Sequence, residues 1–273
     1  MTRRTVLALA LALGGAARLA SALPSTDAVV APGSLVRWPG KDLSGCREGD
    51  RRWAPLDGAC WYAVDLLATG TVEVARVRDG RTERRTLRVA PYPYPEQKIE
   101  LKDDSKVNLS PQDLARALRE EERVARLWSL DGPGHFHLPL LAPLDPLPAG
   151  GRFGSRRVFN GQPRSPHTGA DFPAPAGTPV RAAADGRVVL AEDQFFPGRA
   201  VFVFHGDGLF TMYFHLSAIL VRPGQEVKRG MEIGRVGATG RASGPHLHFG
   251  VRWHGARVDP GLLLGTETVE ELR

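Results

Sequence analysis

Cysteine is scarce in this 273-residue sequence, which contains only Cys46 and Cys60. Both lie in the N-terminal half, away from the histidines that cluster later in the chain, so this pair does not complete a metal site there. In an exported chain, an even pair so close in sequence favours a disulfide over two free thiols. Closing this short loop would stabilise the fold by about 3 kcal/mol in the chain-entropy model.

Long apolar runs are also missing. The run from Val6 to Ala17 is shorter than the roughly 20 residues that a transmembrane helix needs. It follows Arg3 and Arg4 and precedes the small residues 20–22, which is typical of a cleaved signal peptide over residues 1–22. We therefore expect export to the periplasm, cell envelope or exterior. An uncleaved anchor is the alternative, and the choice between Sec and twin-arginine export stays open. The lack of cysteine after the run argues against a lipoprotein anchor.

The sequence lacks a strong excess of one charge. It has 36 Lys plus Arg against 30 Asp plus Glu, and removal of Arg3, Arg4 and Arg18 with the signal peptide leaves an excess of three. This balance gives no support for nucleic-acid binding. A mild positive excess suits an anionic polymer such as cell wall but identifies none. No transmembrane segment is expected after signal removal.

Helix-favouring stretches are few, whereas 31 Gly and 22 Pro indicate many turns between short strands, so we predict a mainly β protein. Its length suggests two domains. Residues 27–90 are expected to form a small β-sandwich. Residues 91–150 are expected to be an extended connector with one helix over about 111–128, capped by Ser110 and packed between the domains. The predicted strands of the first domain are 34–38, 59–67, 71–78 and 82–89.

From residue 151 onward, short strands and tight turns succeed one another without strand-helix-strand alternation. A doubly wound parallel sheet is therefore not expected, and an antiparallel sheet curled into a groove or partial barrel fits residues 151–262 better. Residues 263–273 are expected to be a C-terminal tail. The predicted strands are 156–159, 179–183, 186–192, 200–205, 210–216, 226–228, 232–236 and 246–253.

The C-terminal region centres on two histidines, His246 and His248, which a strand would present side by side on one face. Upstream, His167 and Asp171 form a second cluster, and His215 lies between the two in sequence. Zinc is commonly held by three such protein ligands in hydrolytic sites. His167, Asp171 and one of the paired histidines could supply them, leaving the other and His215 for proton transfer. Another His-x-His pair, at 135 and 137, lacks a nearby partner and is interpreted as a linker strand, with a role near the mouth of the active site as the alternative.

These motifs carry a resemblance. Residues 153–157, 167–172, 213–217 and 244–248 occur in the order found in the lysostaphin-type, or LytM-like, zinc endopeptidases. The resemblance covers roughly residues 151–262, and its motifs are highly specific. The region from 94 to 97 and the helix start at Ser110 also resemble the N-terminal region of exported family members from bacteria with an outer membrane.

The resemblance implies a role for each residue. His167, Asp171 and His248 would bind one Zn²⁺ ion per catalytic domain, and His215 and His246 would lie beside the attacking water. One of these two would act as general base, and the other would stabilise the oxyanion or protonate the leaving amine; the resemblance does not assign which. The substrate would be the peptide stems of peptidoglycan, cut at D-alanyl to diaminopimelate cross-links, with wall-remodelling proteins as possible partners.

Two other classes of function compete with this hypothesis. Some domains of this type have lost ligands and activate cell-wall amidases without chemistry of their own, but all five matching positions are occupied here. A structural zinc domain is the third class. Structural sites usually close all four positions with protein ligands, and the matching positions supply only three.

Overall fold

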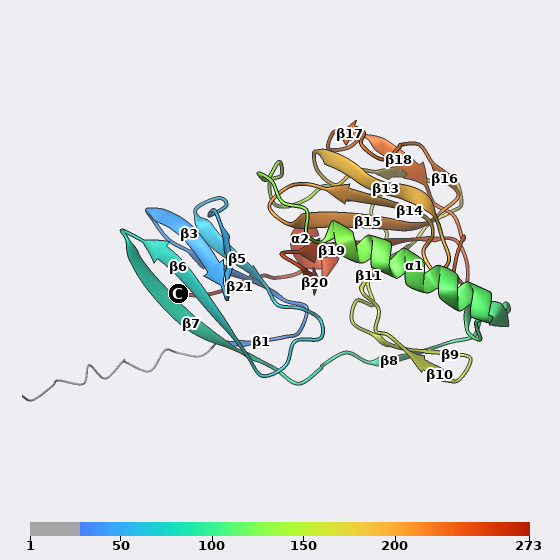
Figure 1. Cartoon of the computed structure of the whole chain (residues 1–273), viewed down its shortest axis with the longest axis horizontal. Helices are drawn as coiled ribbons and strands as arrows, with labels where there is room; N and C mark the ends of the chain where they lie inside the picture. Colours follow the sequence, from blue (N-terminus) through green and yellow to red (C-terminus); the bar gives the residue numbers. More distant parts are fainter. Residues whose placement is uncertain (1–27) are drawn as a thin grey trace, which may run out of the picture.

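The computed structural model describes residues 28–273, so the expected signal peptide over 1–22 lies outside the described residues. The N-terminal part contains two sheets (Figure 1). The first, in spatial order, consists of β1 (Ala28–Val30), β7 (Arg81–Val89), β6 (Thr71–Arg78), β3 (Leu43–Glu48) and β4 (Arg51–Trp53). The second consists of β21 (Glu270–Glu271), β2 (Leu35–Pro39) and β5 (Ala59–Ala63). This agrees with the expected small β-sandwich.

A hydrophobic cluster lies between these two sheets and includes the fully buried side chains of Trp38, Tyr62 and Leu87. Cys46 on β3 and Cys60 on β5 belong to the same cluster, with their Sγ atoms 2.01 Å apart. The bond therefore links the two sheets. Strand β3, which carries Cys46, was absent from the sequence prediction because its apolar residues do not alternate.

Residues 263–273, which were expected to be a C-terminal tail, pack partly on the N-terminal domain. Strand β21 pairs in parallel with β2 of the N-terminal part, and Leu272 is buried in the N-terminal cluster. The preceding helix α2 (Pro260–Leu264) packs on the C-terminal core through the fully buried Leu263. The last residues of the chain thus complete the first domain, which a linear reading of the sequence could not reveal.

The connector forms part of the C-terminal structure. Strand β8 (Glu96–Ile99) pairs in parallel with β9 (Arg156–Phe159), which pairs with β10 (Gln162–Arg164). A short 3-10 helix (Asp104–Lys106) precedes helix α1 (Pro111–Leu127). The Oγ atom of Ser110 accepts a 3.1 Å hydrogen bond from the backbone N–H of Asp113, which is the predicted cap.

Helix α1 was expected between the domains, and this prediction is wrong. The helix lies against one face of the C-terminal sheet (Figure 1), where Val124 and Leu127 pack on a cluster that includes Phe202 and Met212. Ion pairs such as Arg123 with Glu192 of β13 fix its edge. The apolar stripe was identified correctly, but a stripe alone does not reveal which surface it covers.

The main C-terminal sheet is antiparallel throughout. Its strands, in spatial order, are β11 (Gly169–Pro173), β19 (His246–Trp253), β15 (Leu209–Leu216), β14 (Gly198–Phe204), β13 (Gly186–Gln194) and β17 (Glu226–Val227), with β20 (Ala256–Val258) also on β19. A second sheet consists of β12 (Pro179–Arg181), β18 (Glu232–Arg235) and β16 (Ala218–Ile219). The main core lies mostly between these sheets. The sheets stay open, as the groove architecture predicts. No helix in residues 28–273 is long and apolar enough to cross a bilayer.

The two parts of the chain share a packed joint. Trp61 of β5 stacks near Trp253 of β19, with ring centroids 6.2 Å apart. Beside them, Asp65 accepts two hydrogen bonds from the guanidinium of Arg257, at 2.9 and 2.5 Å. Tyr94 of the connector fills the space beside Gly154, where a Cβ atom would lie only 2.4 Å from its ring. These contacts hold the N-terminal sandwich at one end of the C-terminal sheets (Figure 1).

Candidate active site

Two adjacent strands, β11 and β19, position the central residues of the site. Asp171 and His248 are direct cross-strand partners, so their side chains leave the same face of the sheet. His246 lies two residues along β19 and projects from that face too. Gly169 permits this close pairing, because a Cβ atom there would lie 2.6 Å from Nε2 of His248.

The expected metal ligands meet at one point. Oδ1 of Asp171 lies 2.9 Å from Nε2 of His167 and 2.9 Å from Nδ1 of His248, and these two nitrogens are 2.8 Å apart. The ligand atoms of a tetrahedral zinc ion lie about 3.3 Å from one another, given metal–ligand bonds of about 2.0 to 2.1 Å. A shift of about half an ångström would therefore admit the ion. Among residues 28–273, this is the trio that could hold a metal.

Hydrogen bonds orient the imidazole of His167. Its Nδ1 atom lies 2.9 Å from the backbone carbonyl oxygen of Arg152. A carbonyl can only accept, so Nδ1 carries the proton and the lone pair of Nε2 faces Asp171 and His248. The second carboxylate oxygen of Asp171, Oδ2, accepts a 2.6 Å hydrogen bond from Nη2 of Arg157. Both ligands are thus held in the orientation that metal binding requires.

The protonation states also suit a metal. Burial lowers the pKa of His167 to about 4, and it lowers the pKa of His248 as well. Burial alone would raise the pKa of Asp171, but its close contacts with the imidazoles of His167 and His248 outweigh it and hold this pKa well below the usual range. Near neutral pH the site therefore contains two neutral imidazoles and a carboxylate, the forms that bind metal ions.

His215 and His246 lie beside this trio, with their ring centroids 4.8 Å apart. Nδ1 of His215 bonds the carbonyl oxygen of Thr239 at 2.9 Å, and Nδ1 of His246 bonds that of Gly244 at 2.8 Å. Each ring therefore keeps Nε2 free for the site, and Nε2 of His246 lies 3.6 Å from Oδ1 of Asp171.

His215 has an unusual backbone. Its φ angle is +63°, in the left-handed region that non-glycine residues seldom adopt and that is concentrated at functional sites. Burial, reinforced by the nearby imidazoles of His248 and His246, lowers the pKa of His215 to about 3. The ring is therefore neutral at physiological pH and can accept a proton.

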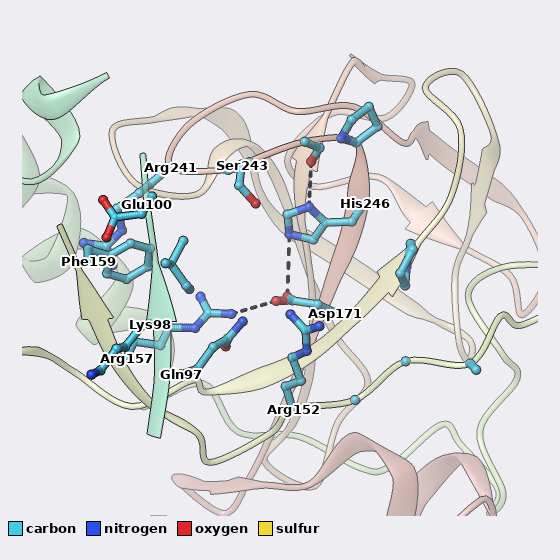
Figure 2. Close-up of a pocket in the computed structure, with 18 residues that line it drawn as sticks. Gln97, Lys98, Glu100, Arg152, Arg157, Phe159, Asp171, Arg241, Ser243 and His246 are labelled. Carbon is cyan, nitrogen blue, oxygen red and sulfur yellow. Dashed lines mark hydrogen bonds and ion pairs between the residues drawn. The ribbon is translucent and has the colours of Figure 1, made fainter. Parts of the chain in front are cut away.

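A groove of about 710 Å³ opens beside the site (Figure 2). One wall comes from β8 and β9, including Gln97 and Arg157, and another from the loop 241–246 before β19. No residue of the N-terminal sandwich, over 28–90, lines this groove. A smaller hollow of about 190 Å³ reaches His167, His215 and His248 from another side. Of the five expected residues, Asp171 and His246 line the large groove, and His167, His215 and His248 line the smaller hollow.

The other histidines lie elsewhere. His135 and His137 are exposed in a loop, not in the strand predicted there, and neither lines the groove. His205 is fully buried, and its Nε2 lies 2.7 Å from the hydroxyl of Thr211, which indicates a structural role. His254 stacks on Trp53 at the joint between the domains.

Sequence reasoning missed two arginines of the site. Arg157 contacts Asp171, and the side chain of Arg241 lies between the rings of Phe159 and Phe196. Both fall within or beside the motifs already singled out, yet arginine at such positions normally indicates a solvated surface. Only the pairing of β8 with β9, which brings these segments over the site, reveals their roles.

The geometry defines a class: an open groove with a His-Asp-His trio and two further imidazoles is the arrangement of a metallopeptidase. Comparison with known proteins agrees. Residues 165–260 match the model of peptidase family M23. A Pseudomonas aeruginosa protein with a crystal structure described as peptidase M23 superposes with a TM-score of 0.64, at 31% identity over 87% of this chain and 96% of that one. This chain belongs to peptidase family M23.

Curated relatives match about a third of this chain. The peptidoglycan DD-endopeptidase ShyA of Vibrio cholerae is 49% identical over 85 residues, which is 31% of this chain and 20% of that protein. The DD-carboxypeptidase/endopeptidase Mpg of Neisseria meningitidis is 48% identical over 94 residues, or 34% of this chain and 22% of that one. The matched segments thus span about a fifth of these relatives.

Proposed function

We propose that this chain is an exported zinc endopeptidase that hydrolyses peptide cross-links of bacterial peptidoglycan, at the bond between D-alanine and diaminopimelate. The observation that carries the proposal is the meeting of His167, Asp171 and His248 at one point, with His215 and His246 beside it. The names of two relatives support the proposed activity: ShyA is a peptidoglycan DD-endopeptidase, and Mpg is a DD-carboxypeptidase/endopeptidase.

His167, Asp171 and His248 would hold the metal. Zinc bound there would lower the pKa of water and polarise the scissile carbonyl. The protein supplies proton transfer, because Nε2 of either His215 or His246 can take the proton of the attacking water. The other imidazole would donate to the oxyanion or to the leaving amine. The Nδ1 bonds to Thr239 and Gly244 leave Nε2 of both rings unprotonated, which suits the ring that accepts the proton of the water. The ring that donates must first be protonated at Nε2.

The groove supports a peptide substrate. An extended chain lying between β8 and the loop 241–246 could hydrogen-bond to exposed backbone and reach the trio at Asp171. The modest positive charge and the expected signal peptide suit a substrate outside the cytoplasm. The N-terminal sandwich does not line the groove, so the full mature chain should be active without release of that domain.

The test is to incubate the full mature chain with cross-linked peptidoglycan, with and without a zinc chelator, and to separate the soluble fragments by mass. Conversion of dimers to monomers that the chelator stops and added zinc restores is expected. Cleavage elsewhere in the stem would overturn the assignment of the bond. No cleavage by the zinc-loaded protein would overturn the enzyme proposal, and stimulation of a wall amidase would then support the activator class.

A further inference from the structure

Arg241 occupies a singular place in the groove. It lines the large groove, the 190 Å³ hollow that reaches His215, and a third hollow of about 300 Å³ behind Glu100. These hollows therefore meet at its side chain.

Two aromatic rings hold this guanidinium in place. Its Cζ atom lies 4.5 Å from the ring centroid of Phe159 on β9 and 4.4 Å from that of Phe196. The backbone N–H of Arg241 also donates a 2.8 Å hydrogen bond to the carbonyl oxygen of Phe196. Stacking between two rings restricts the side chain while leaving the edge of the guanidinium, with its N–H donors, available for an anion.

The charge of Arg241 is not neutralised within residues 28–273, where no carboxylate forms an ion pair with it. By contrast, Arg157, which lies 5.9 Å from the same Phe159 ring, already donates to Asp171. Burial, together with the positive charges of Arg157 and Arg164, lowers the pKa of Arg241 to about 10. The group stays charged at neutral pH but in a setting that favours the arrival of an anion.

The proposed substrate supplies such an anion. In a cross-link from D-alanine to diaminopimelate, the carbon that carries the scissile nitrogen also carries a free carboxylate. That carboxylate is only a few covalent bonds from the scissile bond, so it must lie near the metal trio during cleavage. Arg241 lines the same 190 Å³ hollow as His167 and His248. Its guanidinium and that of Arg157, the partner of Asp171, both lie near the Phe159 ring at the side of the groove (Figure 2).

We propose that Arg241 is a specificity-determining residue that binds the free carboxylate beside the scissile bond, so that the enzyme prefers stems in which this carboxylate is not amidated. The inference rests on the proposed function. A planar guanidinium binds a carboxylate through two parallel N–H bonds, whereas a carboxamide offers one acceptor and an opposing N–H₂ group. Amidation would therefore lose both the charge and one hydrogen bond.

The test combines two enzymes with two substrates. Purified cross-linked muropeptide dimers are prepared with this carboxylate either free or converted to the carboxamide, and kcat/KM is measured for the zinc-loaded full mature chain and for Arg241→Gln. The natural chain should cleave the free acid roughly ten- to a hundredfold faster than the amide. Arg241→Gln should lose that advantage by slowing on the free acid alone, while its rate on the amide stays near that of the natural chain.

Controls separate this role from a structural one. Arg119→Gln, on an exposed position of α1 outside the groove, should keep the preference of the natural chain. Zinc content and thermal melting check that Arg241→Gln is folded and loaded. Equal slowing of Arg241→Gln on both substrates would overturn the proposal in favour of a packing role, as would an unchanged preference. Absence of cleavage of either dimer by the natural chain would instead overturn the proposed function itself.

Discussion

Arg157 donates a 2.6 Å hydrogen bond from Nη2 to Oδ2 of Asp171, so the two carboxylate oxygens have different partners. Oδ1 is left to face the two imidazoles of the metal trio. Arg157 comes from β9, whose partner β8 belongs to the connector, so the connector indirectly supports a proposed metal ligand, Asp171.

We therefore predict that Arg157→Gln weakens zinc binding by about ten- to a hundredfold, as expected when the hydrogen-bond partner of a metal ligand is lost. Competition with a chelating dye measures this affinity. Arg156→Gln is the matched control, because the neighbouring side chain stacks on Tyr92 and lies away from Asp171. Equal affinity in the two variants would contradict the role given to Arg157.

Replacing a ligand should have a larger effect. His167→Ala and Asp171→Ala each remove one of three protein ligands and should abolish both stoichiometric zinc binding and cleavage. Metal analysis after gel filtration provides the measurement. Full zinc occupancy in either variant would show that the metal site is not the one proposed.

His215→Ala should separate binding from chemistry. The ring lies beside the trio but is not part of it, so zinc content should be unchanged while kcat falls by about 10²- to 10⁴-fold, the range for loss of a general acid–base group. His254→Ala, at the joint between the domains, serves as a histidine control outside the groove. Normal turnover by His215→Ala would sink the proton-transfer role.

The stability of the metal-free protein should depend on pH. Burial lowers the pKa of His167 to about 4, of His205 to about 4 and of His215 to about 3, whereas unfolded histidines titrate near about 6.5. Between the folded and unfolded pKa values, the unfolded chain binds more protons than the folded chain. The contribution of these three neutral histidines to the free energy of unfolding is therefore fully present above about pH 6.5 and is lost as the pH falls through the folded pKa values.

Each of these groups can contribute up to about 1.4 kcal/mol per pH unit in that window. Urea unfolding of the metal-free protein from pH 7 to pH 4.5 measures the slope. His137→Gln, which removes an exposed imidazole, serves as the control variant. A free energy of unfolding that stays constant across the window would contradict the prediction.

The end of the chain should matter for stability. Leu272 is buried in the core of the N-terminal sandwich, so Leu272→Ala should lower the free energy of unfolding by about 2 kcal/mol or more. Leu220→Ala, at a side chain that is 48% exposed, is the matched control and should change it little. If the two variants are equally stable, the docking of the C-terminal segment contributes nothing.

The amino-acid sequence by itself determined the mainly β architecture and predicted the central residues of the candidate site. Alternation along β19 places His246 and His248 on one face whatever else the fold does, because neighbouring side chains on a strand point in opposite directions. The motifs that contain His167, Asp171 and His215 are likewise recognised from short stretches of sequence. Short-range patterns and the resemblance that they carry were sufficient for these predictions.

Only the tertiary structure decided which distant segments meet. Leu272 completes the core of the first domain, α1 covers the C-terminal sheet, and β8 brings the connector to the groove. Arg157 and Arg241 acquire their neighbours in the same way. Such contacts join residues that lie far apart in sequence, and the free energy that selects them comes from burial summed over the whole fold, which no local pattern records.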